Sequence, residues 1–391
     1  MKKILFVINS LELGGAEKSL VSLLNTFDLN KYEIDLLMFR VTGMFLKLLP
    51  AKVNVLPSLA FLSPGTSFFV QLKHPWHLAA KARASFGLRK NNKTKKLHPA
   101  QCYWKYTSKC FETLSKEYDV AVAWGQGNPT HYVAEKVNAD KKLAVINVNY
   151  EGAGHNKEFD YQYYKKFNYI IAVSEELGSL VNQVFPDFKE KTRVIYDINN
   201  AELILKMAAA SNPFENEKNV LKIVTAGRLT NQKGYDLAVE AAKILKSQGV
   251  NFKWYFIGEG VCRSSLETMI NQYDLSDMVI LSGAQDNPYV YIKNADIYVQ
   301  TSRFEGYCLT IAEARILNKP IVSTDFDVVH NQIISEENGI IVDMKPKSIE
   351  DAIVRLYSEK GLCAKLINNL SLEKKGNTEE VEKWYSLIEN K

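Results

Sequence analysis

Two stretches of the sequence place charged side chains at spacings that suit the binding of a diphosphate. The first runs from Ala226 to Gly234 after an expected strand, and it holds Arg228 and Lys233 five residues apart between glycines. An arginine offers a bidentate fork to phosphate oxygens, and a lysine offers a compact point charge. Together they favour stabilisation of the charge that develops on a phosphate leaving group. Two unrelated surface charges are the alternative interpretation.

The second stretch, Ser302 to Ala314, places Glu305 on a loop and Glu313 about two turns into an expected helix. Carboxylates accept hydrogen bonds from paired hydroxyls of a sugar or ribose. Main-chain N–H groups at a helix start suit a phosphate. The residues that would supply those groups are Gly306, Tyr307, Cys308 and Leu309. The structural alternatives are a helix-capping acid at Glu305 and a solvated acid at Glu313.

A third candidate is the glycine pair Gly14 and Gly15, which follows the opening strand and precedes an apolar helical pattern. Glycines at such a turn let a ligand approach the backbone. The pair lacks the full G-x-G-x-x-G pattern, so a tight structural turn is an equal alternative.

The elements that position these residues alternate between short apolar runs and longer amphipathic segments, which predicts parallel sheets flanked by helices. In the first half, strands are expected at 3–8, 33–39, 53–56, 120–124, 143–148, 169–173 and 192–196. In the second half, they are expected at 222–226, 253–257, 279–281, 297–300, 320–323 and 339–342. Asn-rich residues 199–219 predict a linker. We therefore expect an α/β chain with one domain over 1–198 and a second over 199–391.

Composition excludes several classes of protein. The 391 residues are 46% hydrophobic and 24% charged, as in ordinary globular proteins. The five cysteines form no C-x-x-C pair and have no histidines at zinc spacing, so neither a disulfide framework nor a metal is expected. No stretch reaches the roughly 18 apolar residues of a spanning helix. The opening apolar run, 4–8, is too short for a signal peptide, so a cytoplasmic location is expected.

The positive charge is concentrated in one segment. From Leu36 to Phe111 there is no Asp or Glu among 76 residues but there are 13 Lys and Arg, so this segment is +13 and the rest of the chain is −8, given a net charge of +5. Aromatic residues are mixed with these charges: Phe45, Phe61, Phe68, Phe69, Trp76, Phe86 and Trp104. This composition suits an anionic membrane surface. A nucleic-acid patch and a solvated basic loop are the alternatives.

Taken together, these motifs resemble the retaining glycosyltransferases of family 4, whose GT-B fold consists of two facing Rossmann-like domains. The resemblance covers nearly the whole chain and depends on the order of the motifs. They are Gly14-Gly15-Ala16-Glu17, the Arg228 to Lys233 loop, Gly258-Glu259-Gly260, Ser282 to Pro288, and the Glu-x7-Glu pair Glu305 and Glu313.

The resemblance implies transfer of a sugar from a nucleotide donor, with UDP-sugar expected, with retention at the anomeric carbon and without a divalent metal or a cofactor. Arg228 and Lys233 would hold the donor diphosphate, beside Gly227 and the helix start at 306–309. Glu313 would hold the ribose and Glu305 the donor sugar. Arg228, Lys233 and Glu305 are thus the expected catalytic residues. Gly14 and Gly15 would line the opposing side of the cleft.

The resemblance also implies a glycan acceptor, and with the basic segment it points to a lipid-linked oligosaccharide of surface polysaccharide synthesis. The protein is then expected at the inner face of the plasma membrane, with no nucleic-acid partner. The last helix, about 376–391, would cross back to pack on the first domain.

One position departs from the family pattern. Relatives often carry a histidine after a mid-domain strand, but the matching run, 145–150, has Asn147 there. An asparagine can hydrogen-bond a sugar hydroxyl but cannot take up a proton at neutral pH. His155 is a candidate substitute, with a surface position as the alternative. We therefore expect Asn147 and His155 as possible acceptor or sugar contacts.

Two other functions remain open. A non-catalytic, transferase-like partner subunit is favoured by Asn147 and disfavoured by the intact Arg228, Lys233, Glu305 and Glu313. An enzyme that isomerises a nucleotide-sugar would need acid and base pairs that the sequence does not show.

Overall fold

The computed structural model describes residues 1–12, 14–62, 75–94, 96–150 and 152–390. Four charged or aromatic residues of the basic segment, Phe68, Phe69, Lys73 and Lys95, lie outside the described residues. The chain forms two compact units. The first comprises Met1–Glu12, Ala16–Asp197 and Glu379–Lys391, and the second comprises Leu13–Gly15 and Ile198–Thr378.

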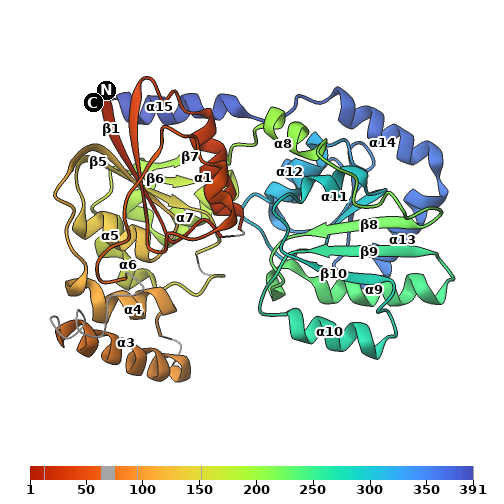
Figure 1. Ribbon diagram of the computed structural model, residues 1–391, viewed down its shortest axis with the longest axis horizontal. Helices are drawn as coiled ribbons and strands as arrows, with labels where there is room; N and C mark the ends of the chain where they lie inside the picture. Colours follow the sequence, from red (N-terminus) through yellow and green to blue (C-terminus); the bar gives the residue numbers. More distant parts are fainter. Residues whose placement is uncertain (13, 63–74, 95, 151, 391) are drawn as a thin grey trace. The chain divides into compact units, whose positions relative to one another are not determined.

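The first unit is built on a parallel seven-stranded sheet in the order β3-β2-β1-β4-β5-β6-β7 (Figure 1). Its strands are β1 (Lys2–Ile8), β2 (Tyr32–Met38), β3 (Asn54–Val55), β4 (Glu117–Trp124), β5 (Asn138–Ile146), β6 (Tyr169–Ala172) and β7 (Thr192–Val194). All seven expected strands are confirmed. β5 begins five residues earlier than expected, because its polar first half pairs with β4 from Glu117↔Asn138 onward and shows no apolar signal.

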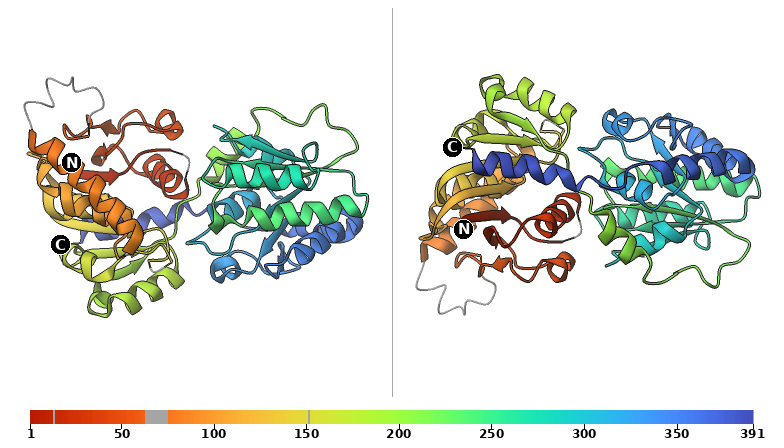
Figure 2. Two further views of the ribbon diagram at one scale, coloured as in Figure 1. Left: turned by 90° about the horizontal axis from the view of Figure 1, so that it is seen from below. Right: turned by 90° about the horizontal axis from the view of Figure 1, so that it is seen from above.

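Helices cover this sheet, and α4 carries a further helix, α3, on its outside (Figures 1 and 2). The helices are α1 (Gly15–Thr26), α3 (Pro75–Thr94), α4 (Pro99–Thr107), α5 (Asn128–Lys136), α6 (Lys157–Tyr164) and α7 (Glu175–Val184). Short 3-10 turns are η1 (Met44–Leu48), η2 (Ser108–Cys110) and η3 (Pro186–Lys191). Residues 75–94 of the basic segment form a helix, so the alternative of a solvated loop is wrong for them.

The helix α15 (Val381–Glu389) also belongs to the first unit, as Figure 2 shows. The Trp384 ring stacks on Trp124 with centroids 5.5 Å apart, and Tyr385 stacks on Tyr32 at 5.3 Å. The Lys2 ammonium pairs with Glu389 at 3.0 Å. The aromatic anchor expected near the C-terminus is present.

The second unit is built on a parallel six-stranded sheet in the order β10-β9-β8-β11-β12-β13. Its strands are β8 (Leu221–Ala226), β9 (Phe252–Ile257), β10 (Val279–Gly283), β11 (Ile297–Gln300), β12 (Ile321–Thr324) and β13 (Ile340–Val342). Its helices are α8 (Ala201–Ala208), α9 (Tyr235–Ser247), α10 (Arg263–Gln272), α11 (Tyr289–Asn294), α12 (Leu309–Ile316), α13 (Pro346–Ser358) and α14 (Lys360–Leu372). The 3-10 turns are η4 (Asn231–Lys233), η5 (Asp327–Asn331) and η6 (Thr378–Glu380). All six expected strands are confirmed.

Residues 199–219 are not the linker that the sequence predicts, because they contain α8. The Asn200 side chain caps this helix by accepting a hydrogen bond from Leu203 N at 3.1 Å. Ile204 and Ala208 are buried in the core on one face of the second sheet. A helix this short has only two or three apolar residues on its buried face, so the sequence pattern did not distinguish it from a polar linker.

The strand orders place the motifs where ligands bind in open α/β sheets. Strand order reverses between β1 and β4 in the first sheet and between β8 and β11 in the second. A crevice forms at such a reversal, beyond the carboxyl ends of the strands. Gly14 follows β1, Gly227 follows β8, and Thr301 follows β11. In the described part of the chain, none of the helices has both the length and the apolar character needed to cross a bilayer.

Candidate functional site

The loop after β8 holds Lys233 in a fixed position. Gly227 packs against it so closely that a side-chain Cβ there would lie 3.3 Å from the Lys233 Cε. The hydroxyl of Thr301, the residue after β11, donates to the Lys233 carbonyl at 2.9 Å. Gly234 follows with φ +64°, a left-handed conformation that glycine adopts without strain. The chain can therefore turn directly into α9.

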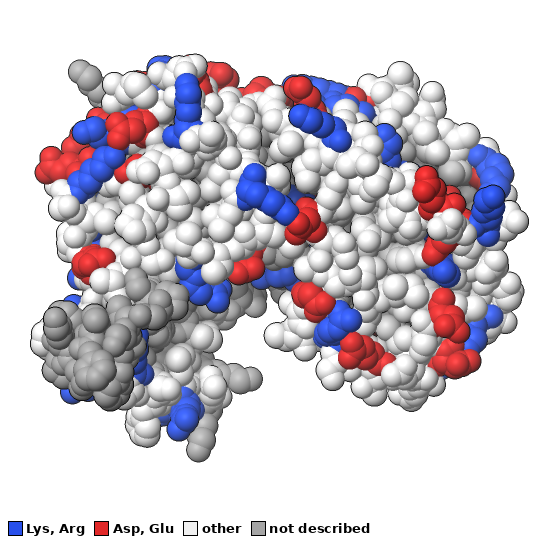
Figure 3. Space-filling model, in the orientation of Figure 1, with Lys and Arg blue, Asp and Glu red and all other residues white. Residues whose placement is uncertain are grey.

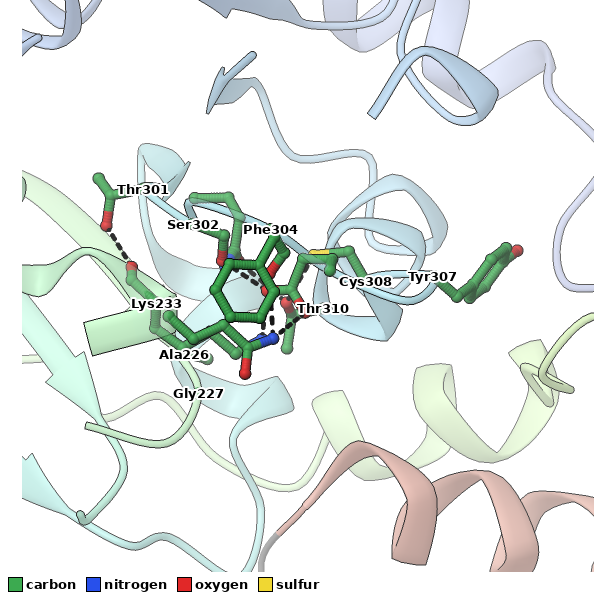
Figure 4. A network of polar contacts seen from close by, with 12 residues as sticks. Ala226, Gly227, Lys233, Thr301, Ser302, Phe304, Tyr307, Cys308 and Thr310 are labelled. Carbon is green, nitrogen blue, oxygen red and sulfur yellow. Dashed lines mark hydrogen bonds and ion pairs between the residues drawn. The ribbon is translucent and has the colours of Figure 1, made fainter. Parts of the chain in front are cut away.

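Lys233 and Glu305 form a largely buried ion pair, with Nζ 2.6 Å from Oε1 (Figure 4). Their side chains are only 15% and 7% exposed. Burial would lower the pKa of Lys233, but the Glu305 carboxylate outweighs this effect and raises the pKa above its usual value. Lys233 is therefore charged, and its ammonium has three donors, of which Glu305 uses one.

A buried network orients Glu305. The Ser302 hydroxyl donates to Glu305 Oε1 at 2.5 Å, and it accepts from Gln300 Nε2 at 2.7 Å. The Thr310 hydroxyl donates to Gln300 Oε1 at 2.9 Å. Sequence reasoning assigned no role to Ser302, Gln300 or Thr310. The one available signal was a polar glutamine at the end of an otherwise apolar strand.

A second connection ties the two loops together through Arg303. Its guanidinium binds the Asp236 carboxylate with two hydrogen bonds of 2.9 and 2.6 Å. Its Nη1 also donates to the Asn231 carbonyl at 2.7 Å. Burial would raise the pKa of Asp236, but Arg303 lowers it below the usual value. The Lys233 loop and the Glu305 loop are thus held as one rigid piece.

Arg228 differs from these residues, because its side chain is exposed and forms no ion pair with any residue that the structure describes. Its charge is close enough to Lys233 to lower the pKa of that lysine slightly, against the larger effect of Glu305. A guanidinium without a partner beside a buried lysine provides two positive charges for an anionic ligand.

The start of α12 faces the same region. No side chain caps this helix, and Cys308, the residue just before its first turn, has φ +67°. The Gln332 amide holds the turn by donating to the Tyr307 carbonyl and, at 3.3 Å, to the Cys308 carbonyl. Burial raises the pKa of the Cys308 thiol to about 12, so it stays protonated. In Figure 4 the Tyr307 ring points away from the network, while Gly306, Cys308 and Leu309 are buried.

Glu313 lies on α12 and is 1% exposed, so the alternative of a solvated acid is wrong. The Tyr289 hydroxyl of α11 donates to Glu313 Oε1 at 3.2 Å. Sequence reasoning missed Tyr289, because nothing in the sequence places α11 beside α12.

In the first unit, Asn147 directly follows β5. Its main-chain N–H donates to Gln126 Oε1 at 3.2 Å, while both amide atoms of its side chain are buried without a hydrogen-bond partner among the described residues. Buried polar atoms without partners are rare and call for a ligand or a water. The expectation of a sugar contact at Asn147 stays a prediction, as does the cleft position of Gly14 and Gly15.

His155 is not at the surface, because its side chain is only 4% exposed within a polar cluster around Asp160. His131 Nε2 lies 2.7 Å from Asp160 Oδ1, and the Tyr150 hydroxyl donates to Oδ2 at 2.6 Å. His155 Nδ1 lies 3.6 Å from the same Oδ2, and the His98 ring stacks on His155 at 4.1 Å. Burial would raise the pKa of Asp160, but the hydrogen bond from His131, the nearby His155 ring and the hydrogen bond from Tyr150 lower it below its usual value. Asp160 is therefore a carboxylate that holds the loop after β5.

The first unit should lose stability in mild acid because of His98. Burial, and then the neighbouring His155, lowers the pKa of His98 to about 4. In the unfolded chain a histidine binds a proton near pH 6.5, so stability is fully present above that pH and falls by about 1–2 kcal/mol towards pH 4, allowing for solvent screening. His98 Nδ1 also caps α4 by accepting from Ala100 N at 3.2 Å, which a protonated Nδ1 cannot do. Urea unfolding at pH 7 and pH 5 measures the loss.

His98→Asn keeps a capping side chain but cannot titrate. We expect this variant to be less sensitive to pH than the wild type, and His330→Asn, at an exposed histidine, to behave as the wild type. An equal pH dependence in the wild type and His98→Asn would refute the role of His98.

Gly234→Ala should destabilise the second unit and weaken binding of anionic ligands. A Cβ at Gly234 would lie 2.0 Å from the Thr301 carbonyl oxygen. We expect a loss of about 2–5 kcal/mol, from the left-handed backbone and from the displaced carbonyl. Gly249→Ala is the matched control, because its φ is +74° with nothing within 4 Å of the new Cβ. Urea unfolding and UDP titration should both separate the two variants, and equal losses would contradict the argument.

Comparisons with known proteins relate this chain to glycosyltransferases. Residues 208–371 match the family model described as glycosyl transferases group 1. Poly(ribitol-phosphate) alpha-N-acetylglucosaminyltransferase of Staphylococcus aureus is 26% identical over 260 residues, or 63% of this chain and 50% of the relative. N-acetylgalactosamine-N,N'-diacetylbacillosaminyl-diphospho-undecaprenol 4-alpha-N-acetylgalactosaminyltransferase of Campylobacter jejuni is 25% identical over 209 residues, or 50% of this chain and 55% of the relative. The chain thus spans about half the length of these curated relatives.

The fold is decided by a solved structure. The crystal structure of HepE of Anabaena in complex with UDP and glucose matches with a TM-score of 0.72 at 15% identity, over 99% of this chain and 98% of that one. The chain has the GT-B fold. In this GT-B chain, the region that matches the family model contains Arg228, Lys233, Glu305 and Glu313. The expected fold class, two Rossmann-like units with parallel sheets, is confirmed.

Proposed function

We propose that this GT-B protein is a retaining glycosyltransferase of family 4 that transfers a sugar from UDP-sugar to a glycan acceptor. One observation carries the proposal. At the reversal of strand order in the second sheet, an exposed Arg228 without an ion-pair partner among the described residues lies near a charged, buried Lys233 and near the Glu305 carboxylate, which residues of two loops hold in place. Two cations and a helix start suit a diphosphate, and the acids suit sugar hydroxyls.

The proposed chemistry follows from the charges. As the bond between the anomeric carbon and the diphosphate oxygen breaks, negative charge grows on the diphosphate. Lys233 retains two N–H donors for its oxygens, and Arg228 offers a bidentate fork. These cations supply the countercharge that a divalent metal supplies elsewhere, so we propose a metal-independent reaction. The acceptor hydroxyl attacks on the face from which the diphosphate leaves and gives its proton to that group. The configuration at the anomeric carbon is thereby retained.

The proposed acceptor is a lipid-linked glycan of surface polysaccharide synthesis. The Campylobacter jejuni relative is named for a diphospho-undecaprenol acceptor, and the Staphylococcus aureus relative for poly(ribitol-phosphate). The acid-free segment 36–111 suits an anionic membrane surface, where such an acceptor resides. We propose that the protein works at the inner face of the plasma membrane.

A donor screen tests the proposal. The purified chain is incubated with a panel of nucleotide-sugars, with and without a detergent-solubilised polyprenyl-diphosphate sugar, in buffer with EDTA. We expect slow hydrolysis of one donor and faster transfer when the acceptor is present. NMR should show the same anomeric configuration in the product as in the donor. Failure to bind or hydrolyse any donor would favour the non-catalytic partner subunit, for which Asn147 in place of histidine is the supporting observation.

Glu313→Gln should selectively weaken recognition of the ribose. A carboxylate accepts hydrogen bonds from both ribose hydroxyls, whereas an amide offers one acceptor oxygen and its donors face the wrong way. We expect UDP binding to weaken about tenfold to a hundredfold, as for hydrogen bonds to a charged group, and 2′-deoxy-UDP binding to change less. Calorimetric titration of both nucleotides measures this. Glu350→Gln, at another buried acid of the second unit, is the control, and equal losses for both nucleotides would contradict the role of Glu313.

A further inference from the structure

The helix α3 exposes apolar side chains along its outer side. Ala80, Ala84 and Asn91 face inward and are buried. Leu78, Ala82 and Phe86 follow one another at helical spacing on the opposite side, and all are exposed, with Phe86 72% exposed. Trp76, at the start of the helix, is 57% exposed. This pattern is the reverse of an ordinary surface helix, whose outer side is polar.

The exposed side also carries positive charge. Lys81 lies at one edge of the row formed by Leu78, Ala82 and Phe86, and Arg83 and Lys90 lie at the other edge. Arg89 follows Phe86 in the same row. Arg83 and Arg89 form no ion pair with any described residue. The helix contains no Asp or Glu, and Figure 3 shows blue and white atoms but no red ones over it. We call this outer surface, formed by Leu78, Lys81, Ala82, Arg83, Phe86, Arg89 and Lys90, the α3 face.

The packing of α3 leaves this face available. The helix contacts α4 and the η2 turn rather than the sheet. The contact with α4 is tight, since a Cβ at Gly87 would lie 2.2 Å from the Tyr106 ring. The Lys81 ammonium lies 5.1 Å from the centre of the Phe61 ring, which holds that edge of the face against the unit. Among the described residues, the inner side of the helix and Lys81 at one edge thus make its main contacts.

We infer that the α3 face docks on an anionic bilayer, and this assignment rests on the membrane location proposed above. Phe86 and Leu78 would enter the boundary between headgroups and acyl chains, while the flanking lysines and arginines contact anionic headgroups. Nucleic acid fits the α3 face less well, because the apolar side chains at the centre of the face would be buried against phosphates. An anionic lipid surface is therefore the binding partner that we infer for the α3 face.

Vesicle sedimentation of the full chain tests this inference. We expect binding to phosphatidylcholine vesicles that contain phosphatidylglycerol, weak binding to phosphatidylcholine alone, and weakening by salt. Arg83→Gln, Arg89→Gln and Phe86→Ser combined should lower the partition coefficient at least about 25-fold, since each charge contributes about fivefold. Lys206→Gln, Lys365→Gln and Leu372→Ser, exposed residues of the second unit, form the matched control and should bind as the wild type.

The inference is overturned if the α3-face variant binds vesicles as the wild type does, if the wild type binds no vesicles, or if it binds duplex oligonucleotides instead. Donor hydrolysis is measured on the same preparations and should be unchanged by the α3-face variant. Vesicle binding without hydrolysis would leave the α3 face in place and refute the proposed function. Donor hydrolysis without vesicle binding would support the proposed function and refute the role of the α3 face.

Discussion

Lys233→Ala is expected to lower the rate constant of sugar transfer about a hundredfold to a thousandfold, the usual cost of removing one preorganised charge at a developing anion. The ammonium of Lys233 is fixed by Glu305 at 2.6 Å and by the Gly227 turn, so no other side chain of the loop can take its place. Single-turnover transfer with saturating UDP-sugar measures the change.

The variant also leaves the Glu305 carboxylate without its cation, and this effect must be separated from catalysis. The Ser302 hydroxyl still donates to Glu305, so we expect the second unit to stay folded with reduced stability. Lys233→Ala with Glu305→Gln should regain stability without regaining rate. Lys246→Ala, at a surface lysine of α9, is the control and should transfer normally. Normal turnover in Lys233→Ala would refute the assignment of Lys233.

Arg228→Ala is expected to have the second largest effect on function, and it should change ligand binding without changing stability. Arg228 is exposed and has no ion-pair partner in the described residues, so its removal should leave the urea unfolding midpoint unchanged. We expect UDP affinity to fall about tenfold to a hundredfold, because hydrogen bonds to charged groups contribute about 1.5–3 kcal/mol. The affinity for uridine, which has no diphosphate, should not change.

Two variants sharpen this test. Arg228→Lys restores the charge without the fork and should recover part of the UDP affinity. Arg355→Ala removes an arginine of α13 that pairs with Glu336, and this variant should bind UDP as the wild type does. If Arg228→Ala weakened UDP and uridine equally, the arginine would contact the nucleoside, and its diphosphate role would be wrong.

The sequence was informative wherever local pattern decides structure. Apolar runs predicted the strands of both sheets. The family resemblance implied a shared site for Arg228, Lys233 and Glu305, and the structure pairs Lys233 with Glu305. It failed where structure depends on distant pairing. The first half of β5 is polar and is a strand only because β4 lies beside it. His155 is buried because the cluster around Asp160 closes over it, which its glycine-flanked position in the sequence does not reveal.

The supporting network of the site was similarly hidden. Arg303 and Asp236 lie 67 residues apart, and Gln300 orients Ser302 only because of where α12 begins. Such contacts follow from the placement of loops rather than from residue type. Motifs can therefore nominate candidate ligand contacts, while the residues that hold those candidates in place are found only in the fold.

The position of α15 has a consequence for synthesis on the ribosome. Trp124 and Tyr32 of the first unit are covered by Trp384 and Tyr385, which are translated only after all of the second unit. Residues 198–378 form an almost continuous segment, so the unit that emerges later can complete its core first. The first unit therefore completes this aromatic packing only after α15 has been translated.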